Sequence, residues 1–301
     1  MVSTSEITEK IRSEFNFEVN RLPLSGPDNM PTKWYGLFRS DNGKTVGPGS
    51  VSPGYFPHTV NHIVSIAEAA IGSFDEASDV CCHFRDGHYV SIAPTAKYRK
   101  RVYGSTHDTI WPRLVISAGL GGSTSFNLTI GYFRDACKNL AMMRKIKSFN
   151  IRYRHTASIN DRLDSLVEDF KGLREGWESL SDLVDRMNQT DVVIADVIKQ
   201  VYGEIDPNAG RKAQTMQENR VDAIVRRVIR ENRALGSGTH GGDHATAWQM
   251  YNAIQGYHQH DAPRRVKSGG EPVTRWDRII TTSNNPNVLS AENILVAQTA
   301  A

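Results

Sequence analysis

Cysteine is scarce in this chain of 301 residues, which has only Cys81, Cys82 and Cys137. Neighbouring cysteines on a strand point to opposite faces, which is poor geometry for a disulfide. We therefore expect free thiols and a reducing cytoplasm. Long apolar runs are missing as well, since no stretch of about 18 apolar residues is present to span a bilayer. The N-terminal residues also lack the apolar region of a secretory signal, so neither membrane insertion nor secretion is expected.

Signatures of nucleotide-dependent and nucleophilic enzymes are lacking too. Residues 119–123 are rich in glycine, but they lack the Lys-Ser/Thr end of a phosphate loop and lie between two expected strands, which favours a hairpin turn. No Gly-x-Ser-x-Gly elbow or carboxylate pair stands out. A catalytic pair of Cys137 and His155 is an alternative to a core cysteine, which we favour. We therefore expect no catalytic residue and no cofactor.

Histidines 240, 244, 258 and 260 form the most metal-like group in the sequence, because histidines spaced by four residues on a helix can share one ion. His240 falls in a glycine-rich linker, and the glutamate of a metalloprotease motif is absent. We therefore favour surface or hydrogen-bonded histidines over metal ligands. A metal-dependent nucleic-acid enzyme that uses this group is kept as an alternative.

Positive charge, by contrast, is concentrated in residues 97–154, which carry a net charge of +10, whereas the rest of the chain carries −7. Aromatic residues are interleaved with these cations. Clustered cations neutralise a phosphate backbone, and aromatic rings stack on unpaired bases. The residues that we expect to contact nucleic acid are Lys97, Tyr98, Arg99, Lys100, Arg101, Arg113, Lys138, Arg144, Lys145, Lys147, Arg152, Tyr153 and Arg154. The alternative is a set of surface cations that pair with acidic helices elsewhere in the chain.

Arg152 and Arg154 are the strongest individual candidates. Residues 149–154 alternate in polarity, which predicts a strand with Phe149, Ile151 and Tyr153 on one face and the two arginines on the other. Residues two apart on a strand are separated by about 6.6–6.8 Å in rise, close to the spacing of successive phosphates in an extended single strand.

Apolar periodicity and turn residues predict the secondary structure. The expected strands are residues 34–39, 44–51, 78–84, 89–93, 113–118, 126–133 and 149–154. The expected helices are residues 3–15, 61–73, 134–145, 160–187, 191–202, 213–235 and 244–257. In the helix 213–235, the residues expected to face inside are Met216, Val221, Ile224, Val225, Val228 and Ile229. Asn42-Gly43 predicts a tight hairpin turn. Ser3 or Ser5 and Asn61 are the expected helix caps, and residues 22–31 are expected to form an exposed connector.

Residues 160–187 carry a heptad pattern, which predicts a helix of about 28 residues and about 42 Å. Its apolar positions are Leu163, Leu166, Phe170, Leu173, Trp177, Leu180, Val184 and Met187. The apolar seam pairs either with a later helix of the same chain or with a second subunit, and the spacing does not choose between them. Trp177 and Trp248 lie on helical stripes and are expected in the core.

These patterns predict an α+β fold: an antiparallel, hairpin-rich sheet packed on helices, with a long heptad-patterned helical arm inserted before the C-terminal helices. The expected segments are residues 1–33, an N-terminal helix and connector; 34–157, a basic α+β core; 158–235, the helical arm; 236–260, a linker and a helix that packs on the core; and 261–301, a polar C-terminal tail that is mobile in part.

Several blocks of the sequence resemble the phage/plasmid-like "domain of unknown function 932" family. The similar blocks are the hairpin 38–47, Asn61 at the start of a helix, residues 134–140 with an Arg-x-x-Cys-x-Asn pattern, residues 151–156 with an Arg-His-Thr strand, and residues 246–254 with a Thr-x-Trp-x-x-x-Asn-Ala pattern. The resemblance covers residues of about 34 to 260. It implies a gene of phages, plasmids or their bacterial hosts, and it implies no particular activity.

In layout the chain also resembles the single-strand annealing proteins of the Red-beta/Erf kind, which is an argument by analogy. Our first hypothesis is therefore an ATP-independent protein that binds and anneals single-stranded DNA as a homo-oligomeric ring or filament. The second is a protein-interaction module whose heptad helix docks a phage or host protein. DNA and RNA, and single and double strands, are not distinguished by the sequence.

Overall fold

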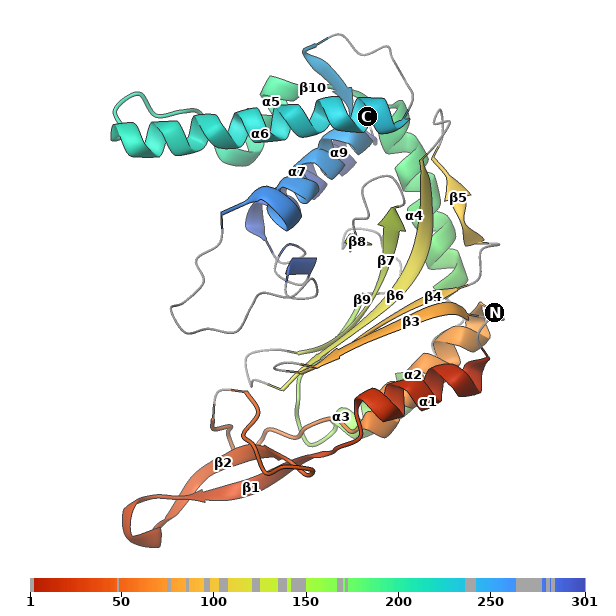
Figure 1. Ribbon diagram of the computed structural model, residues 1–301, viewed down its shortest axis with the longest axis vertical. Coiled ribbons are helices and arrows are strands. Elements are labelled where there is room, and N and C mark those ends of the chain that lie inside the picture. The colour runs from red at the N-terminus through yellow and green to blue at the C-terminus, as the bar shows by residue number, and fades with distance from the viewer. Residues whose placement is uncertain are drawn as a thin grey trace. The chain divides into compact units, whose positions relative to one another are not determined.

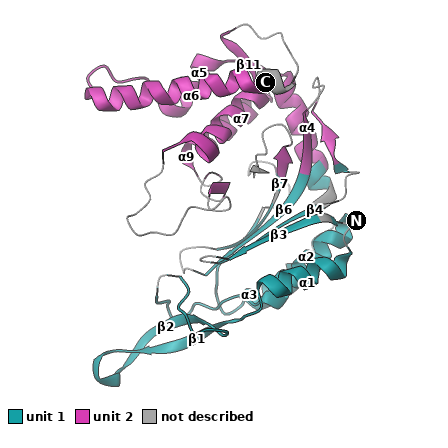
Figure 2. Cartoon of the chain, in the orientation of Figure 1, with its two compact units in different colours: residues 1–98, 112–131, 147–177 teal, residues 99–111, 132–146, 178–301 magenta. Residues whose placement is uncertain are grey.

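The computed structural model describes most of the chain. The described residues are 3–47, 49–74, 77–84, 87–94, 98–102, 108–120, 125–134, 140–141, 150–166, 170, 173–235, 242–263, 278–279, 282 and 285–300. The chain divides into two compact units, coloured separately in Figure 2. Unit 1 holds residues 1–98, 112–131 and 147–177, and unit 2 holds residues 99–111, 132–146 and 178–301. The units are interleaved along the sequence, whereas the five expected segments are consecutive.

Two capped helices open unit 1. Helix α1 (Thr4–Glu14) begins at Ser3, whose side chain forms a capping box with Glu6, as predicted. Helix α2 (Val60–Ser73) begins one residue earlier than expected and is capped by Thr59, so the prediction that Asn61 caps it is wrong. The hydroxyl of Thr59 accepts a hydrogen bond from the backbone N–H of His62, the third residue of the helix. Thr59 therefore takes the capping role that was predicted for Asn61.

The main sheet is antiparallel and hairpin-rich, which confirms the predicted α+β class. Its strands are β3 (Ala77–Phe84), β4 (Gly87–Pro94), β5 (Lys100–Arg101), β6 (Thr109–Gly119), β7 (Phe126–Arg134), β8 (Leu140–Ala141) and β9 (Asn150–Tyr153). The order is β3-β4-β6-β7-β8, with β5 paired to β6 and β9 paired to β7. In unit 1, α1 packs on α2 and β3, and α2 packs on β4 (Figure 1).

A separate two-stranded ribbon projects from unit 1 (Figure 1). Strand β1 (Val19–Ser25) pairs antiparallel with β2 (Pro31–Arg39), so the prediction of a connector over residues 22–31 is wrong. Pro23 by itself indicates a turn, but proline is tolerated in an edge strand. The predicted turn at Gly43 is present with φ of 67°. Among the described residues of 44–51, backbone pairing with β2 is limited to isolated bridges at Thr45 and Val51, so the predicted returning strand is not formed there.

The predicted heptad helix is divided. The structure has α3 (Ile159–Leu166), a 3-10 turn at Phe170 and α4 (Leu173–Gln189), so one continuous helix is wrong. The side chains of the seam are nevertheless buried within the single chain where they are described, namely Leu163, Leu166, Phe170, Trp177, Leu180, Val184 and Met187. The seam is therefore covered by the chain's own core, and the two alternatives for its partner are decided in favour of the same chain.

Unit 2 is mainly helical beyond the ends of the sheet strands. Its remaining elements are β10 (Asp191–Val193), α5 (Ile194–Tyr202), α6 (Arg211–Leu235), β11 (His244–Thr246), α7 (Ala247–Gly256), the π-turn η4 (Tyr257–Asp261) and α9 (Pro286–Gln298). Strand β10 pairs with β11. Residues 191–193 and 244–246 were predicted to be helical, and this prediction is wrong. Helix α7 packs on α6 and α9. Among the described helices, none is both long and apolar enough to cross a membrane.

Two further predictions fail in unit 2, and the C-terminal segment contains a helix that was not predicted. The helix predicted over 134–145 is wrong, because Arg134 ends β7 and Leu140–Ala141 forms β8. Met216 and Ile229 of α6 were expected inside, yet they are 56% and 49% exposed. The C-terminal tail contains α9, a regular helix with buried Val288 and Leu295, where the polar composition predicted only a polar, partly mobile tail.

Candidate nucleic-acid interface

Five of the thirteen predicted contact residues lie outside the described residues. These are Lys97, Lys138, Arg144, Lys145 and Lys147. The other eight are divided between the units. Unit 1 contains Tyr98, Arg113, Arg152, Tyr153 and Arg154, and unit 2 contains Arg99, Lys100 and Arg101.

Arg152 of strand β9 and Arg154, the residue just after it, are exposed, as the alternation predicts, and Ile151 and Tyr153, which alternate with them, are partly buried. Within the part of the chain that the structure describes, β9 pairs only with β7 and is therefore an edge strand. The Nε of Arg152 donates a hydrogen bond of 2.8 Å to the Oγ of Ser125, which fixes the direction of the side chain. Among the described residues, no carboxylate forms an ion pair with either arginine.

Tyr153 and Arg162 extend this surface from β9 onto α3. The guanidinium of Arg162 lies 6.0 Å from the centroid of the Tyr153 ring, at the limit of a cation–π contact. Arg162 itself is exposed. Sequence reasoning missed Arg162 because it lies in an acidic segment, where a single cation carries no signal. We use the term β9 surface for Arg152, Tyr153, Arg154 and Arg162.

Arg113 and Tyr98, by contrast, are engaged inside unit 1. The Nη2 of Arg113 lies 2.8 Å from Oδ2 of Asp79, and its Nη1 donates to the Oγ of Ser91 at 3.1 Å. The Tyr98 ring packs edge-on against Phe74 at 4.9 Å between centroids. These contacts direct both side chains into the unit, so neither belongs to the β9 surface.

In unit 2 the three predicted contacts have different surroundings. The guanidinium of Arg99 stacks on Trp111, 3.5 Å from the ring centroid. Lys100 is a surface cation that pairs with an acidic helix, as the alternative interpretation predicts. Its Nζ lies 2.8 Å from Oδ2 of Asp185 on α4. Arg101 is exposed on β5. Lys100 is therefore neutralised by α4.

Helix α6 carries exposed cations outside the basic stretch. Arg226 and Arg230 are exposed on either side of the exposed Ile229, whereas Arg227 is bound by both carboxylate oxygens of Asp261 at 2.6 and 3.0 Å. The spacing of four residues between Arg226 and Arg230 places them on one helix face. That spacing was visible in the sequence, but only the apolar residues of this helix were given a place, inside the fold.

A group of buried histidines lies beside the β9 surface. His155 follows Arg154 directly and stacks on Tyr55, with 4.9 Å between ring centroids. The Nε2 of His58 lies 2.8 Å from the Nδ1 of His88. Burial lowers the pKa of His88 to about 3, aided by Arg39, and lowers that of His155 to about 4, opposed by hydrogen bonding to backbone. Burial and the neighbouring His88 hold the pKa of His58 well below its ordinary value. These rings are therefore neutral near pH 7 and add no charge to the surface.

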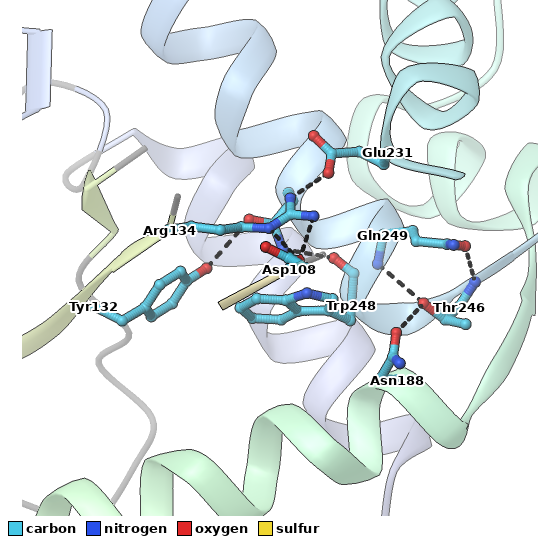
Figure 3. Close-up of polar contacts among 9 residues, drawn as sticks. Asp108, Tyr132, Arg134, Asn188, Glu231, Thr246, Trp248 and Gln249 are labelled. Carbon is cyan, nitrogen blue, oxygen red and sulfur yellow. Dashed lines mark hydrogen bonds and ion pairs between the residues drawn. The ribbon is translucent and has the colours of Figure 1, made fainter. Parts of the chain in front are cut away.

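Residues from two of the five blocks that carry the family resemblance, Arg134 and residues 246–249, meet in a buried polar network of unit 2, drawn in Figure 3. Arg134 of β7 forms ion pairs with Asp108 and Glu231, and all three side chains are at most 4% exposed. Burial raises the pKa of Asp108, while Arg134 beside it opposes this effect. The guanidinium of Arg134 lies 5.7 Å from the ring centroid of Trp248.

The other end of this network caps helix α7 (Figure 3). The Oγ1 of Thr246 accepts a hydrogen bond from the backbone N–H of Gln249 and donates one to Oδ1 of Asn188 at 3.2 Å. The Tyr132 ring packs on Trp248 at 5.1 Å. Because Arg134, Tyr132 and Trp248 are fully buried, we interpret these motif residues as holding unit 2 together.

Three of the four histidines considered as metal ligands are described by the structure, namely His244, His258 and His260. His244 is exposed on β11, with its Nδ1 2.7 Å from Oδ2 of Asp191, and the Nε2 of His258 lies 2.9 Å from the hydroxyl of Tyr202. His240 and Cys137 lie outside the described residues. Within the described ranges, no group of three or more His, Cys, Asp or Glu side chains is placed to hold a metal ion. Cys81 is exposed and Cys82 is half-buried, and both are free thiols.

Comparison with known families gives one match. The profile of the family described as "Domain of unknown function (DUF932)" matches residues 49–280. The chain belongs to the DUF932 family. The matched range includes Arg134, Thr246 and Trp248 of the buried network and the whole β9 surface, whereas the β1–β2 ribbon precedes it. No curated protein and no solved structure shows significant similarity to the chain.

Proposed function

We propose that this DUF932 protein binds and anneals single-stranded DNA without ATP and acts as a homo-oligomer. The observation that carries the proposal is the exposure of Arg152 on strand β9 and of Arg154 directly after it, with no carboxylate partner among the described residues. Arg113 and Lys100 of the same basic stretch are paired with aspartates. The cations of β9 therefore remain available to phosphates.

Annealing requires no bond to be made or broken. It requires that backbone charge be neutralised so that two strands can approach, and that the bases stay available for pairing. Guanidinium groups suit the first task because they form forked hydrogen bonds with phosphate oxygens. Arg154 follows the last residue of β9, so an extended backbone from Arg152 to Arg154 has a rise of about 6.6–6.8 Å, which fits successive phosphates of an extended polynucleotide.

The buried seam of α3 and α4 also favours this proposal over a docking module. A helix that docks a partner through its apolar seam needs that seam exposed, whereas Leu163, Leu180 and Val184 are at most 1% exposed in the single chain. The exposed residues of these helices are mainly polar and charged. The heptad pattern therefore no longer supports the docking of a partner helix.

The test is fluorescence anisotropy of a labelled single-stranded oligonucleotide across a salt series. Each phosphate contact contributes about 0.7 to the slope of log K against log salt for single strands. The double variant Arg152→Ala with Arg154→Ala is expected to reduce that slope by about 1 to 2. A matched double variant, Arg12→Ala with Lys199→Ala, removes the same charge from exposed positions elsewhere and should leave the slope unchanged.

Two further measurements complete this test. Annealing of complementary strands is followed by fluorescence transfer, and the size of the protein is followed by sedimentation with and without the oligonucleotide. We expect annealing without nucleotide and an assembly that grows when DNA is added. No binding at low salt, or an affinity that does not change with salt, contradicts the proposal.

A further inference from the structure

The β1–β2 ribbon carries apolar side chains on both faces. One face packs into unit 1, where Val19 and Leu37 join a core cluster with Phe17 and Val51. In an antiparallel ribbon, residues directly opposite one another share a face, so Leu22 and Gly36 lie on the other face, together with Trp34 and Phe38 by alternation. We call this second face the outer face. Antiparallel sheets usually present polar residues to water, so an apolar outer face indicates a binding surface.

The exposure of the side chains supports this reading. Leu22 is 50% exposed, Trp34 is 44% exposed, and Met30 at the turn of the ribbon is 66% exposed. Gly36 lies between them in a crowded position, because a Cβ there would fall 2.5 Å from the Phe38 ring and 3.0 Å from Leu24. Phe38 and Leu24 therefore close over the glycine and make the outer face continuous.

The edge of the ribbon is less suited to a partner than its face. Pro23 lies in the middle of β1 and has no N–H to donate to an added strand. The opposite edge of β2 is partly occupied by the bridges to Thr45 and Val51. A partner is therefore expected to stack on the outer face.

Cations lie beside aromatic rings of the ribbon, and Arg21, which pairs with Leu37, belongs to the inner face. The Nζ of Lys33 lies 5.6 Å from the ring centroid of Trp34. The guanidinium of Arg21 lies between Tyr35 at 3.8 Å and Phe56 at 4.6 Å, and the backbone N–H of Phe56 donates to the carbonyl of His155, the residue after Arg154. This chain of contacts within unit 1 joins the base of the ribbon to the β9 surface.

We propose that the outer face of the β1–β2 ribbon is a stacking surface for unpaired bases, with Trp34 as the principal platform and Lys33 beside it as a phosphate contact. This inference rests on the proposed function and adds the second component of binding to it. The β9 surface neutralises the backbone, and the ribbon takes the bases. Stacking on an aromatic ring tolerates every base, which suits a protein that handles strands of any sequence.

A second copy of the chain is the other occupant that an apolar face suggests. A stable interface between proteins needs roughly 800 Å² from each partner. Leu22, Met30 and Trp34 are few and already partly covered, so they offer much less than this area. The lysine beside Trp34 also fits a polyanion better than an apolar surface of a like-charged copy.

The experiment compares two ligands of equal length and charge: oligothymidylate and an abasic oligodeoxyribose phosphate. Trp34→Leu keeps an apolar side chain and removes the aromatic face, whereas Trp34→Phe keeps an aromatic face. Trp34→Leu is expected to weaken binding of oligothymidylate by about 5- to 100-fold and to leave binding of the abasic ligand and the salt slope unchanged. Trp34→Phe should retain most of the affinity.

The possible results separate this inference from the proposed function. If the unaltered protein binds neither ligand, the proposed function fails. If it binds with the expected salt slope but Trp34→Leu weakens neither ligand, or both equally, the stacking surface is wrong and the β9 surface stands. If Trp34→Leu reduces the size of the protein assembly in the absence of nucleic acid, the outer face contacts a second copy and the inference is overturned.

Discussion

Arg134 and Asp108 form a buried ion pair in unit 2, with 2.6 Å between the Nε of the arginine and Oδ2 of the aspartate. Both side chains have no exposed surface, and Glu231 contacts the same guanidinium. One cation thus compensates two buried carboxylates that come from distant parts of the sequence. This arrangement gives Arg134 and the neighbouring Trp248, which come from two of the blocks that resemble the family, a structural role inside unit 2.

Removal of the arginine should therefore destabilise unit 2 strongly. Arg134→Met leaves Asp108 and Glu231 buried without a cation, and such a change costs about 3–5 kcal/mol in the free energy of unfolding. Urea denaturation at pH 7 measures it. Lys199→Ala is the control, because its ion pair with Glu204 is exposed and should contribute nothing measurable. Equal midpoints for the two variants would show that the triad does not hold the fold.

The buried histidines predict a loss of stability in mild acid. The folded-state pKa values of His58, His88 and His155 are lowered, so the unfolded chain binds protons first as the pH falls below about 6.5. The stability they contribute is fully present above that pH and is lost toward pH 4. Each histidine contributes about 1.4 kcal/mol per pH unit within this window.

Urea denaturation at pH 7, 6 and 5 measures this dependence. His88→Phe is the informative variant, because the ring already packs among Phe15, Phe17 and Phe84. It should reduce the pH dependence by about one proton. A stability that does not change between pH 7 and 5 would mean that these rings are protonated, or accessible, in the folded chain.

The cap of helix α7 gives a smaller, specific effect. Thr246→Ala removes the hydroxyl that accepts from the Gln249 N–H and donates to Asn188, and should lower the free energy of unfolding by about 1–2 kcal/mol. Thr246→Ser keeps the hydroxyl and should behave nearly as the unaltered chain does. Thermal unfolding followed by circular dichroism compares them, and equal losses would assign the effect to the methyl group instead.

Two glycines make a matched pair. A Cβ at Gly87 would fall 2.4 Å from the carbonyl oxygen of Ala118 and 2.5 Å from the Cα of Gly119, so Gly87→Ala forces β4 away from β6. A cost of about 1–3 kcal/mol is expected. Gly72, near the end of α2, faces open space, and Gly72→Ala should stabilise by about 0.5–1 kcal/mol. The midpoint of chemical denaturation should therefore fall for Gly87→Ala and rise for Gly72→Ala.

Local patterns determined much of the fold. The alternation of residues 149–154 predicted that Arg152 and Arg154 share the exposed side of a strand, and both are exposed. The heptad spacing predicted which side chains of α3 and α4 are buried, although it did not predict the break between the helices. Ser3 was one of two predicted caps, and it stands three residues before Glu6, which is the spacing of a capping box. Periodicity within one element reports which side of that element faces the core, so a local pattern is enough to predict the buried side.

Only the tertiary structure decided which cations are available and which polar residues are internal. Lys100 and Arg113 resemble Arg152 in sequence, but Asp185 and Asp79 reach the first two from distant segments. Strand β1 was missed because its partner, β2, outweighs the local effect of Pro23. The burial of Arg134 likewise depends on carboxylates 26 and 97 residues away. The physical reason is that a charge is quenched, or a strand formed, by a neighbour in space, and periodicity carries no information about that neighbour.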